Sequence, residues 1–255
     1  MTGDRPVRRG LVGPTIAAAC AFALLIGLGT WQVKRLAWKE ALIATVTARF
    51  AAPPTRLPPP ADWARLDPAN NEFQRVSVTA EFLNDKEALV FTTGSSMRSG
   101  DSGPGYWVFT PARFAGGTVM VNRGFVPDGR QDPATRPQGE VAGPVEIVGV
   151  MRWPEKAGMF TPSPQPAKNL WFSRDSTGIA AAKGVVGPVA PFYIEQEAPP
   201  APGGLPHVGA LKPSFPNNHL GYAFTWYGLA AVLVGVFGAW FAGRWRERQQ
   251  ASAQT

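Results

Sequence analysis

The chain has 255 residues, of which 45% are hydrophobic, and it carries a formal net charge of +7. More than half of this positive charge lies on two short terminal tails, which excludes a folded nucleic-acid-binding surface. Cys20 is the only cysteine, so a disulfide framework and a multi-thiolate metal site are excluded as well.

Two long uncharged stretches near the ends of the chain predict two transmembrane helices. We expect them at residues 11–33 and 217–243, because each can cross a hydrocarbon core of roughly 30 Å at about 1.5 Å per residue. A cleaved lipoprotein signal is the alternative for the first stretch, since residues 17–20 resemble a cleavage box. The apolar run continues past Cys20, which favours a membrane helix.

Basic residues beside the two spans predict their orientation. Arginines mark both tails, at Arg5, Arg8, Arg9, Arg244, Arg246 and Arg248. Flanking Lys and Arg residues are retained in the cytoplasm, so residues 1–10 and 244–255 are expected to be cytoplasmic tails. Residues 34–212 then form a periplasmic domain. The first tail is too short and too poor in serine for a mitochondrial transit peptide, which favours a bacterial inner membrane.

The central segment is predicted to be rich in β-strands. Residues 35–49 extend the first helix beyond the membrane, and the proline-rich residues 53–60 form an extended linker. From Arg75 to Phe82, apolar and polar residues alternate, as in a strand with one buried face. The expected elements are strands at 75–82, 88–93, 106–110, 118–123, 145–152, 169–174 and 191–197, a helix at 176–183 and a loop at 100–105.

These elements define the predicted fold class. We expect a membrane protein in which two terminal transmembrane helices flank an extracytoplasmic, β-rich domain. Short strands separated by Gly and Pro indicate an antiparallel sandwich or barrel with one short helix.

The central domain offers no convincing catalytic motif. His207 and His219 are the only histidines, and no metalloprotease, phosphate-binding or dinucleotide-binding motif is present. Glu195 and Glu197 lie two residues apart on one strand, where solvent-facing charge is the favoured interpretation over acid–base chemistry. The sequence therefore favours a protein that is not an enzyme.

His219 is the most informative residue, because an ionisable group at the end of a membrane helix is costly and usually has a partner or a role. On a helix, Tyr222 and Trp226 lie within about 60° of it. A glycine stripe on the opposite side is expected to pack on the small residues of the first span, with His219 pointing away from that contact. The residues concerned are Gly221, Gly228 and Gly235 on one helix and Ala19, Ala23 and Gly27 on the other.

Two interpretations of His219 follow from the residues alone. It can belong, with the neighbouring aromatic residues, to the polar and aromatic belt at the membrane surface. Alternatively, an imidazole in an aromatic setting can be an axial ligand of haem iron.

Short motifs along nearly the whole chain resemble the surfeit locus protein 1 family. They occur in the same order and at the same spacing between two terminal spans, at residues 29–35, 105–108, 121–127, 152–155, 169–175, 191–195, 217–220 and 225–228. The resemblance implies an assembly factor for cytochrome c oxidase, and it implies that His219 binds haem a, with Tyr222 and Trp226 shaping the pocket.

The same resemblance implies partners and a second motif. Expected partners are the catalytic subunit of the oxidase, haem a synthase and membrane lipids. Asn122, Arg123 and Gly124 match a family motif in the central domain, where Gly124 is expected to serve folding through a bulge or a positive φ angle. The alternative function is a haem-independent scaffold that stabilises an assembly intermediate of the oxidase.

Overall fold

The computed structural model describes residues 11–94, 102–209, 211 and 215–253. It divides into two compact units. The helix unit comprises Met1–Ala44 and Phe215–Thr255, and the β unit comprises Thr45–Ser214. The predicted tail 1–10 and the last two residues of the predicted tail 244–255 lie outside the described residues.

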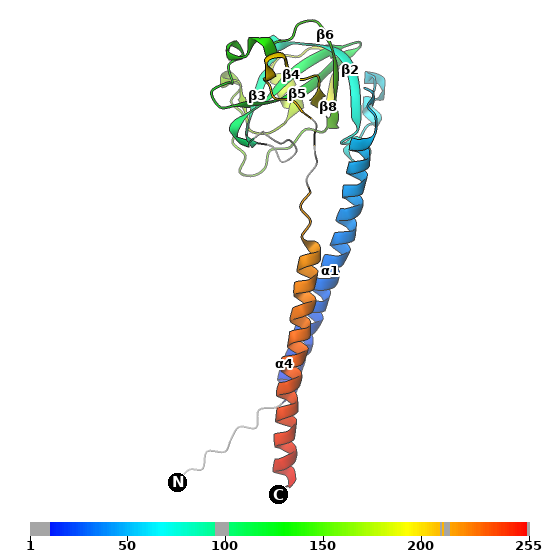
Figure 1. The fold of residues 1–255 in the computed structure, drawn as a ribbon, viewed down its shortest axis with the longest axis vertical. Helices are drawn as coiled ribbons and strands as arrows, with labels where there is room; N and C mark the ends of the chain where they lie inside the picture. Colours follow the sequence, from blue (N-terminus) through cyan, green and yellow to red (C-terminus); the bar gives the residue numbers. More distant parts are fainter. Residues whose placement is uncertain (1–10, 95–101, 210, 212–214, 254–255) are drawn as a thin grey trace. The chain divides into compact units, whose positions relative to one another are not determined.

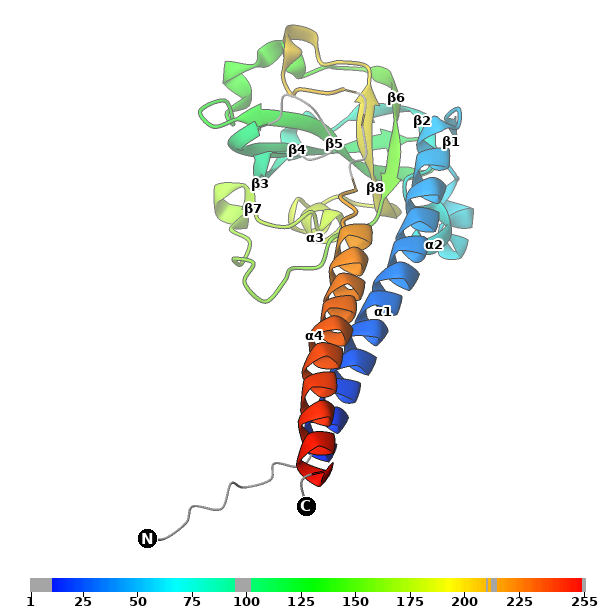
Figure 2. The same cartoon turned by 60° about the horizontal axis from the view of Figure 1, so that its bottom comes forward.

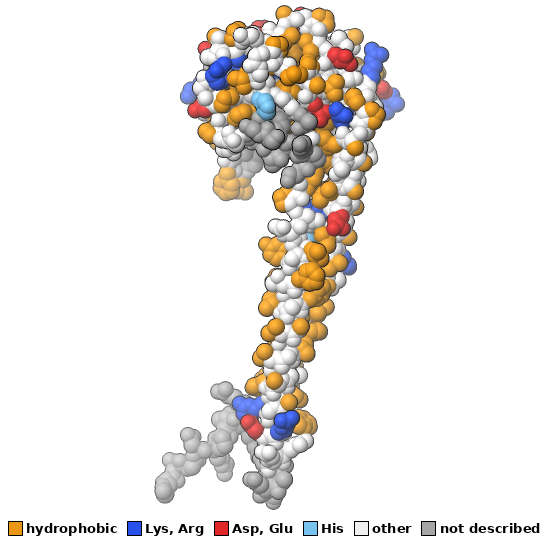
Figure 3. All heavy atoms as spheres, viewed as in Figure 1, with side chains coloured by type: hydrophobic (Ala, Val, Ile, Leu, Met, Phe, Trp, Pro, Cys, Tyr) orange, Lys and Arg blue, Asp and Glu red, His pale blue; other side chains and the backbone are white. Residues whose placement is uncertain are grey.

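Two long helices, α1 (Val12–Ala51) and α4 (His219–Ala253), account for the described part of the helix unit (Figure 1). Both are long and apolar enough to cross a membrane, and only 6% and 11% of their most apolar stretches are buried in the protein. Hydrophobic side chains are spread along the visible faces of the helices, and charged side chains appear near the ends (Figure 3). Such exposure distinguishes them from the core helices of a soluble protein, as the apolar runs predicted.

A five-stranded barrel forms the centre of the β unit (Figure 2). Its strands follow one another around the barrel in the order β2, β6, β8, β5 and β4, and a pairing of β2 with β4 closes it. The bounds are β2 Arg75–Phe82, β4 Ser102–Phe114, β5 Gly117–Pro127, β6 Pro144–Arg152 and β8 Val189–Ala198. The expectation of a sandwich or barrel is confirmed in its barrel form.

Three further short strands and two short helices surround the barrel. β3 (Ala88–Gly94) pairs with β4 and with β7 (Leu170–Trp171), and β1 (Thr55–Arg56) pairs in parallel with β2. The short helices are α2 (Pro68–Asn71) and α3 (Ser176–Ala182). α3 begins at Asp175, whose carboxylate accepts a hydrogen bond from the Gly178 amide at 3.0 Å.

Alternating side chains divide the core of the β unit into two layers. The barrel interior is filled from all five strands, with Val76, Val121, Ile147 and Phe192 among its buried residues. Side chains that point the other way from β4, β5 and β8 pack beneath β7 and α3, where Tyr193 lies 5.2 Å from the Phe109 ring.

Some predicted details are wrong. β5 and β8 run parallel, because the chain between them crosses through β6, β7 and α3 before it returns to the sheet. The strand expected at residues 169–174 is only two residues long. In the predicted loop 100–105, residues 102–105 belong to β4, and residues 100 and 101 lie outside the described part of the chain. The proline-rich linker is extended as expected, but part of it forms β1.

Candidate functional site

His219 and Gln32 form the main polar contact between the two long helices. His219 is the first residue of α4 and is half-buried, while Gln32 on α1 is only 8% exposed. The Nδ1 atom of His219 lies 2.7 Å from Oε1 of Gln32. Because a carbonyl oxygen can only accept a hydrogen bond, Nδ1 is the donor in this contact, and in the neutral ring Nε2 carries the lone pair. In the described residues, no hydrogen bond to Nε2 is present.

Other contacts hold the two helices in an antiparallel arrangement. The Tyr227 hydroxyl lies 3.2 Å from the Thr30 hydroxyl, and the Tyr227 ring packs so closely on Gly29 that a Cβ there would lie 2.6 Å from it. Towards the other end, the Lys39 ammonium donates to the backbone carbonyl of Pro216. The helix pair is therefore held by several contacts besides the one at His219.

The predicted packing faces of the two helices are wrong. The three glycines of α4 and Gly27 of α1 face open space, and Ala19 and Ala23 are exposed. Instead, Ala223 and Ala230 are buried on the same face of α4 as His219, so His219 points towards α1. This rotation pairs an amide and an imidazole that would be costly unpaired in hydrocarbon, and it also brings Tyr227 against Gly29 and Thr30.

The two aromatic residues expected beside His219 take different positions. Trp226 is half-buried near the contact face, whereas Tyr222 is 56% exposed on the flank of α4. Of the three residues expected to form a haem site, His219 and Trp226 are thus half-buried, and Tyr222 is exposed. Sequence reasoning missed Gln32. The sequence does contain a clue to this residue. Gln32 is a polar amide near the end of the first apolar stretch, and His219 lies near the start of the second, so two antiparallel helices bring them to the same level.

This arrangement suits one kind of metal chemistry. The described residues contain no group of three or more His, Cys, Asp or Glu side chains that could hold a bare metal ion. A single imidazole with an anchored Nδ1–H and a lone pair on Nε2 suits an iron that already sits in a porphyrin. The residues present therefore fit a haem better than a metal ion alone.

The motif in the β unit, Asn122 to Gly124, forms buried contacts. The Asn122 amide donates to both carboxylate oxygens of Glu195 at 3.0 Å and accepts from the Gly124 amide at 3.1 Å. Gly124 has φ +115°, which confirms the expected folding role. The prediction that Glu195 faces solvent is wrong, because Glu195 is only 3% exposed. Glu197 pairs with Arg75 at 2.9 Å.

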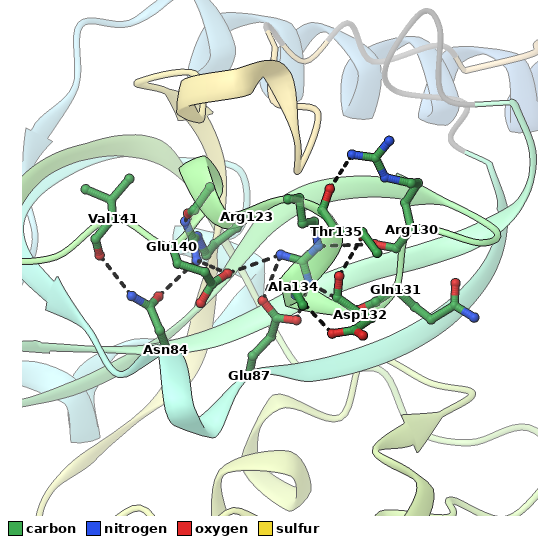
Figure 4. Close-up of polar contacts among 12 residues, drawn as sticks. Asn84, Glu87, Arg123, Arg130, Gln131, Asp132, Ala134, Thr135, Glu140 and Val141 are labelled. Carbon is green, nitrogen blue, oxygen red and sulfur yellow. Dashed lines mark hydrogen bonds and ion pairs between the residues drawn. The ribbon is translucent and has the colours of Figure 1, made fainter.

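Arg123 belongs to a buried ionic network (Figure 4). Its guanidinium donates to Asn84 at 3.1 Å and to the carbonyl of Gly139, and it lies 3.9 Å from Glu140. Arg136 pairs with both carboxylate oxygens of Glu87 and with Glu140 at 3.3 Å. Burial raises the pKa of Glu87 and lowers the pKa of Arg123. This network joins β5 to the short 3-10 helix η4 (Pro137–Gly139), whose Gly139 carbonyl accepts from Arg123.

Comparison with known proteins identifies the family. A sequence model of the SURF1 family matches residues 19–231. The chain is 37% identical to the SURF1-like protein of Monosiga brevicollis over 83% of this chain and 81% of that one. It is 37% identical to surfeit locus protein 1 of Rattus norvegicus and 36% identical to that of Homo sapiens, over 82% and 81% of this chain and 70% of each relative. This chain belongs to the SURF1 family.

In this SURF1 protein, further motif segments of the β unit meet in a second ionic network. The Arg174 guanidinium lies 2.5 Å from Glu155, and Arg152 lies 3.0 Å from Glu72. Burial opposes the charged form of Arg174, but neighbouring Tyr193, Glu195 and Glu155 raise its pKa overall. The motif residues Asn122, Arg123, Arg152 and Arg174 of the β unit thus lie in hydrogen-bonded and ionic contacts within the folded domain.

Proposed function

We propose that this protein is a non-enzymatic assembly factor for cytochrome c oxidase that binds haem a at His219 and helps to insert it into the catalytic subunit. The contact between Nδ1 of His219 and Oε1 of Gln32 supports this proposal best. It leaves the Nε2 lone pair for a ligand, and it occurs in a chain whose family resemblance implies oxidase assembly.

Each residue of the site has a separate task in this proposal. His219 binds the iron through Nε2, while Tyr222 and Trp226 provide apolar ring faces beside the macrocycle. Bound haem a would supply an iron that accepts an imidazole nitrogen. A single histidine would hold the haem less tightly than two, which favours release to the oxidase over permanent retention.

The proposed setting is a bacterial inner membrane. Both tails are cytoplasmic, residues 34–212 are periplasmic, and lipids contact the exposed faces of α1 and α4. The arginines that follow the apolar part of α4 support this orientation. Haem a synthase is the proposed donor of haem a, and the catalytic subunit of the oxidase is the proposed acceptor.

A haem-independent scaffold is the second candidate. The same contact gives it support, because a hydrogen bond between Gln32 and His219 can simply hold two membrane helices together. In that case the β unit stabilises an oxidase intermediate, and no iron is bound.

An absorption spectrum separates the two candidates. The full chain is purified in detergent from cells that make haem a, beside His219→Ala and His207→Ala. The second variant is a matched control, because it removes the only other imidazole of the chain. We expect a haem band in the wild type and in His207→Ala that is absent from a folded His219→Ala variant. A haem band that survives in His219→Ala refutes His219 as the iron ligand. If none of the three proteins shows a band and oxidase assembly still depends on the protein, the result supports the scaffold.

A further inference from the structure

Gln32 is the one buried polar side chain in the described parts of α1 and α4 that belong to the helix unit. Its carbonyl oxygen contacts Nδ1 of His219, the nitrogen opposite the one that would bind iron. Hydrogen-bond acceptors at this position fix the ring orientation of metal-binding histidines and increase their electron donation.

We propose that Gln32 is a positioning residue that holds the His219 ring for iron binding and sets the reduction potential of the bound haem. This inference rests on the proposed function. Gln32 accepts the Nδ1–H hydrogen bond, so the proton stays on Nδ1 and the lone pair stays on Nε2. A neutral amide is a weaker acceptor than a carboxylate, so the imidazole remains a moderate donor to the iron, as a protein that must release its haem requires.

The remaining helix contacts argue against a purely adhesive role for Gln32. Tyr227 packs against Gly29 and Thr30. The buried Ala223 and Ala230 bring the helices close together, and the Lys39 ammonium donates to the Pro216 carbonyl. Loss of one hydrogen bond among these contacts leaves the pair assembled, whereas the His219 ring loses its only described side-chain partner.

The test compares two variants that each remove one hydrogen bond between the helices. Gln32→Leu removes the bond to His219, and the matched control Thr30→Val removes the bond to Tyr227. The purified full chain without haem is titrated with ferric haem a extracted from cytochrome c oxidase, and the midpoint potential of the bound haem is measured by redox titration.

We expect Gln32→Leu to weaken haem binding by about 10-fold to 100-fold. Its midpoint potential moves to a more positive value, because the imidazole donates less to ferric iron. Thr30→Val keeps both values. Gln32→Glu retains the affinity and moves the midpoint potential to a more negative value, because a carboxylate oxygen accepts more strongly from Nδ1 than the amide does.

Three results overturn the inference. If Gln32→Leu and Thr30→Val weaken binding equally, the bond serves only helix packing. If Gln32→Leu changes neither affinity nor potential while His219→Ala abolishes binding, Gln32 has no positioning role and the proposed function stands. If the wild-type protein binds no haem a, the proposed function fails and the inference fails with it.

Discussion

Replacing Gly124 with alanine tests the close backbone contact between β5 and the segment at His207. Gly124 has φ +115°, and a Cβ there would lie 2.1 Å from the backbone oxygen of His207. That oxygen accepts a hydrogen bond from the Phe125 amide at 3.1 Å, and the His207 amide donates to the Phe125 carbonyl at 2.7 Å. The added methyl group must therefore push these two backbone segments apart.

The expected cost has two parts. A backbone conformation reserved for glycine costs an alanine about 1–3 kcal/mol, and each lost backbone hydrogen bond costs about 1 kcal/mol. With one conformational penalty and two lost bonds, Gly124→Ala lowers the free energy of unfolding by about 3–5 kcal/mol. At about 2–4 °C per kcal/mol, the melting temperature falls by about 6–20 °C.

The assay is unfolding of the full chain in detergent, followed by tryptophan fluorescence. Gly129→Ala is the matched control, because Gly129 also has a positive φ, +83°, but a Cβ there meets nothing within 4 Å. We expect the control to lose only the conformational part, about 1–3 kcal/mol. Equal losses in the two variants would refute the steric argument.

Three further substitutions test other contacts. Arg136→Met leaves buried Glu87 without its bidentate partner and lowers the free energy of unfolding by about 3–5 kcal/mol at pH 7. Burial already raises the pKa of Glu87, so protonation of Glu87 restores part of this stability as the pH falls. Melting temperatures at pH 7 and pH 5 measure the difference. Asn122→Asp places a second carboxylate against Glu195 and lowers the melting temperature at pH 7, and by a smaller amount at pH 5. A melting temperature that is unchanged at both pH values would contradict this contact. Ala230→Leu disrupts the helix pair, because Ala230 is buried, whereas Gly228→Leu is tolerated, because Gly228 faces open space. The yield of a cross-link between the two helices measures this difference.

Local patterns predicted most of the β unit, because each strand buries alternate residues. The run from Val76 to Phe82 is the clearest case, since every second side chain is buried in the barrel. The closure of the barrel was not predictable in the same way. It depends on the pairing of Glu81 with Arg113, which are far apart in the chain and carry no pattern that reveals the contact.

The candidate site was only partly predictable for a related reason. His219 stood out because an imidazole is costly in a membrane, but which helix face packs depends on the partner helix. The glycine stripe pointed to the wrong face, because the observed contact face carries the polar pair of His219 with Gln32 and the contacts of Tyr227 with Gly29 and Thr30. Glu195 was misassigned as solvent-facing because the sequence pattern does not show that its strand is covered on both sides, by the barrel and by the segment of β7 and α3.

Barrel closure also limits how other proteins can bind the β unit. The five barrel strands pair with one another around the ring, and the strands at the two ends of the sheet, β1 and β7, are two residues long. β7 pairs only with Leu89 and Val90 of β3, so Phe91–Gly94 keep an outer edge that pairs with no described strand. Docking by strand addition is therefore restricted to short stretches such as this one, and a partner that binds elsewhere on the barrel recognises side chains and turns.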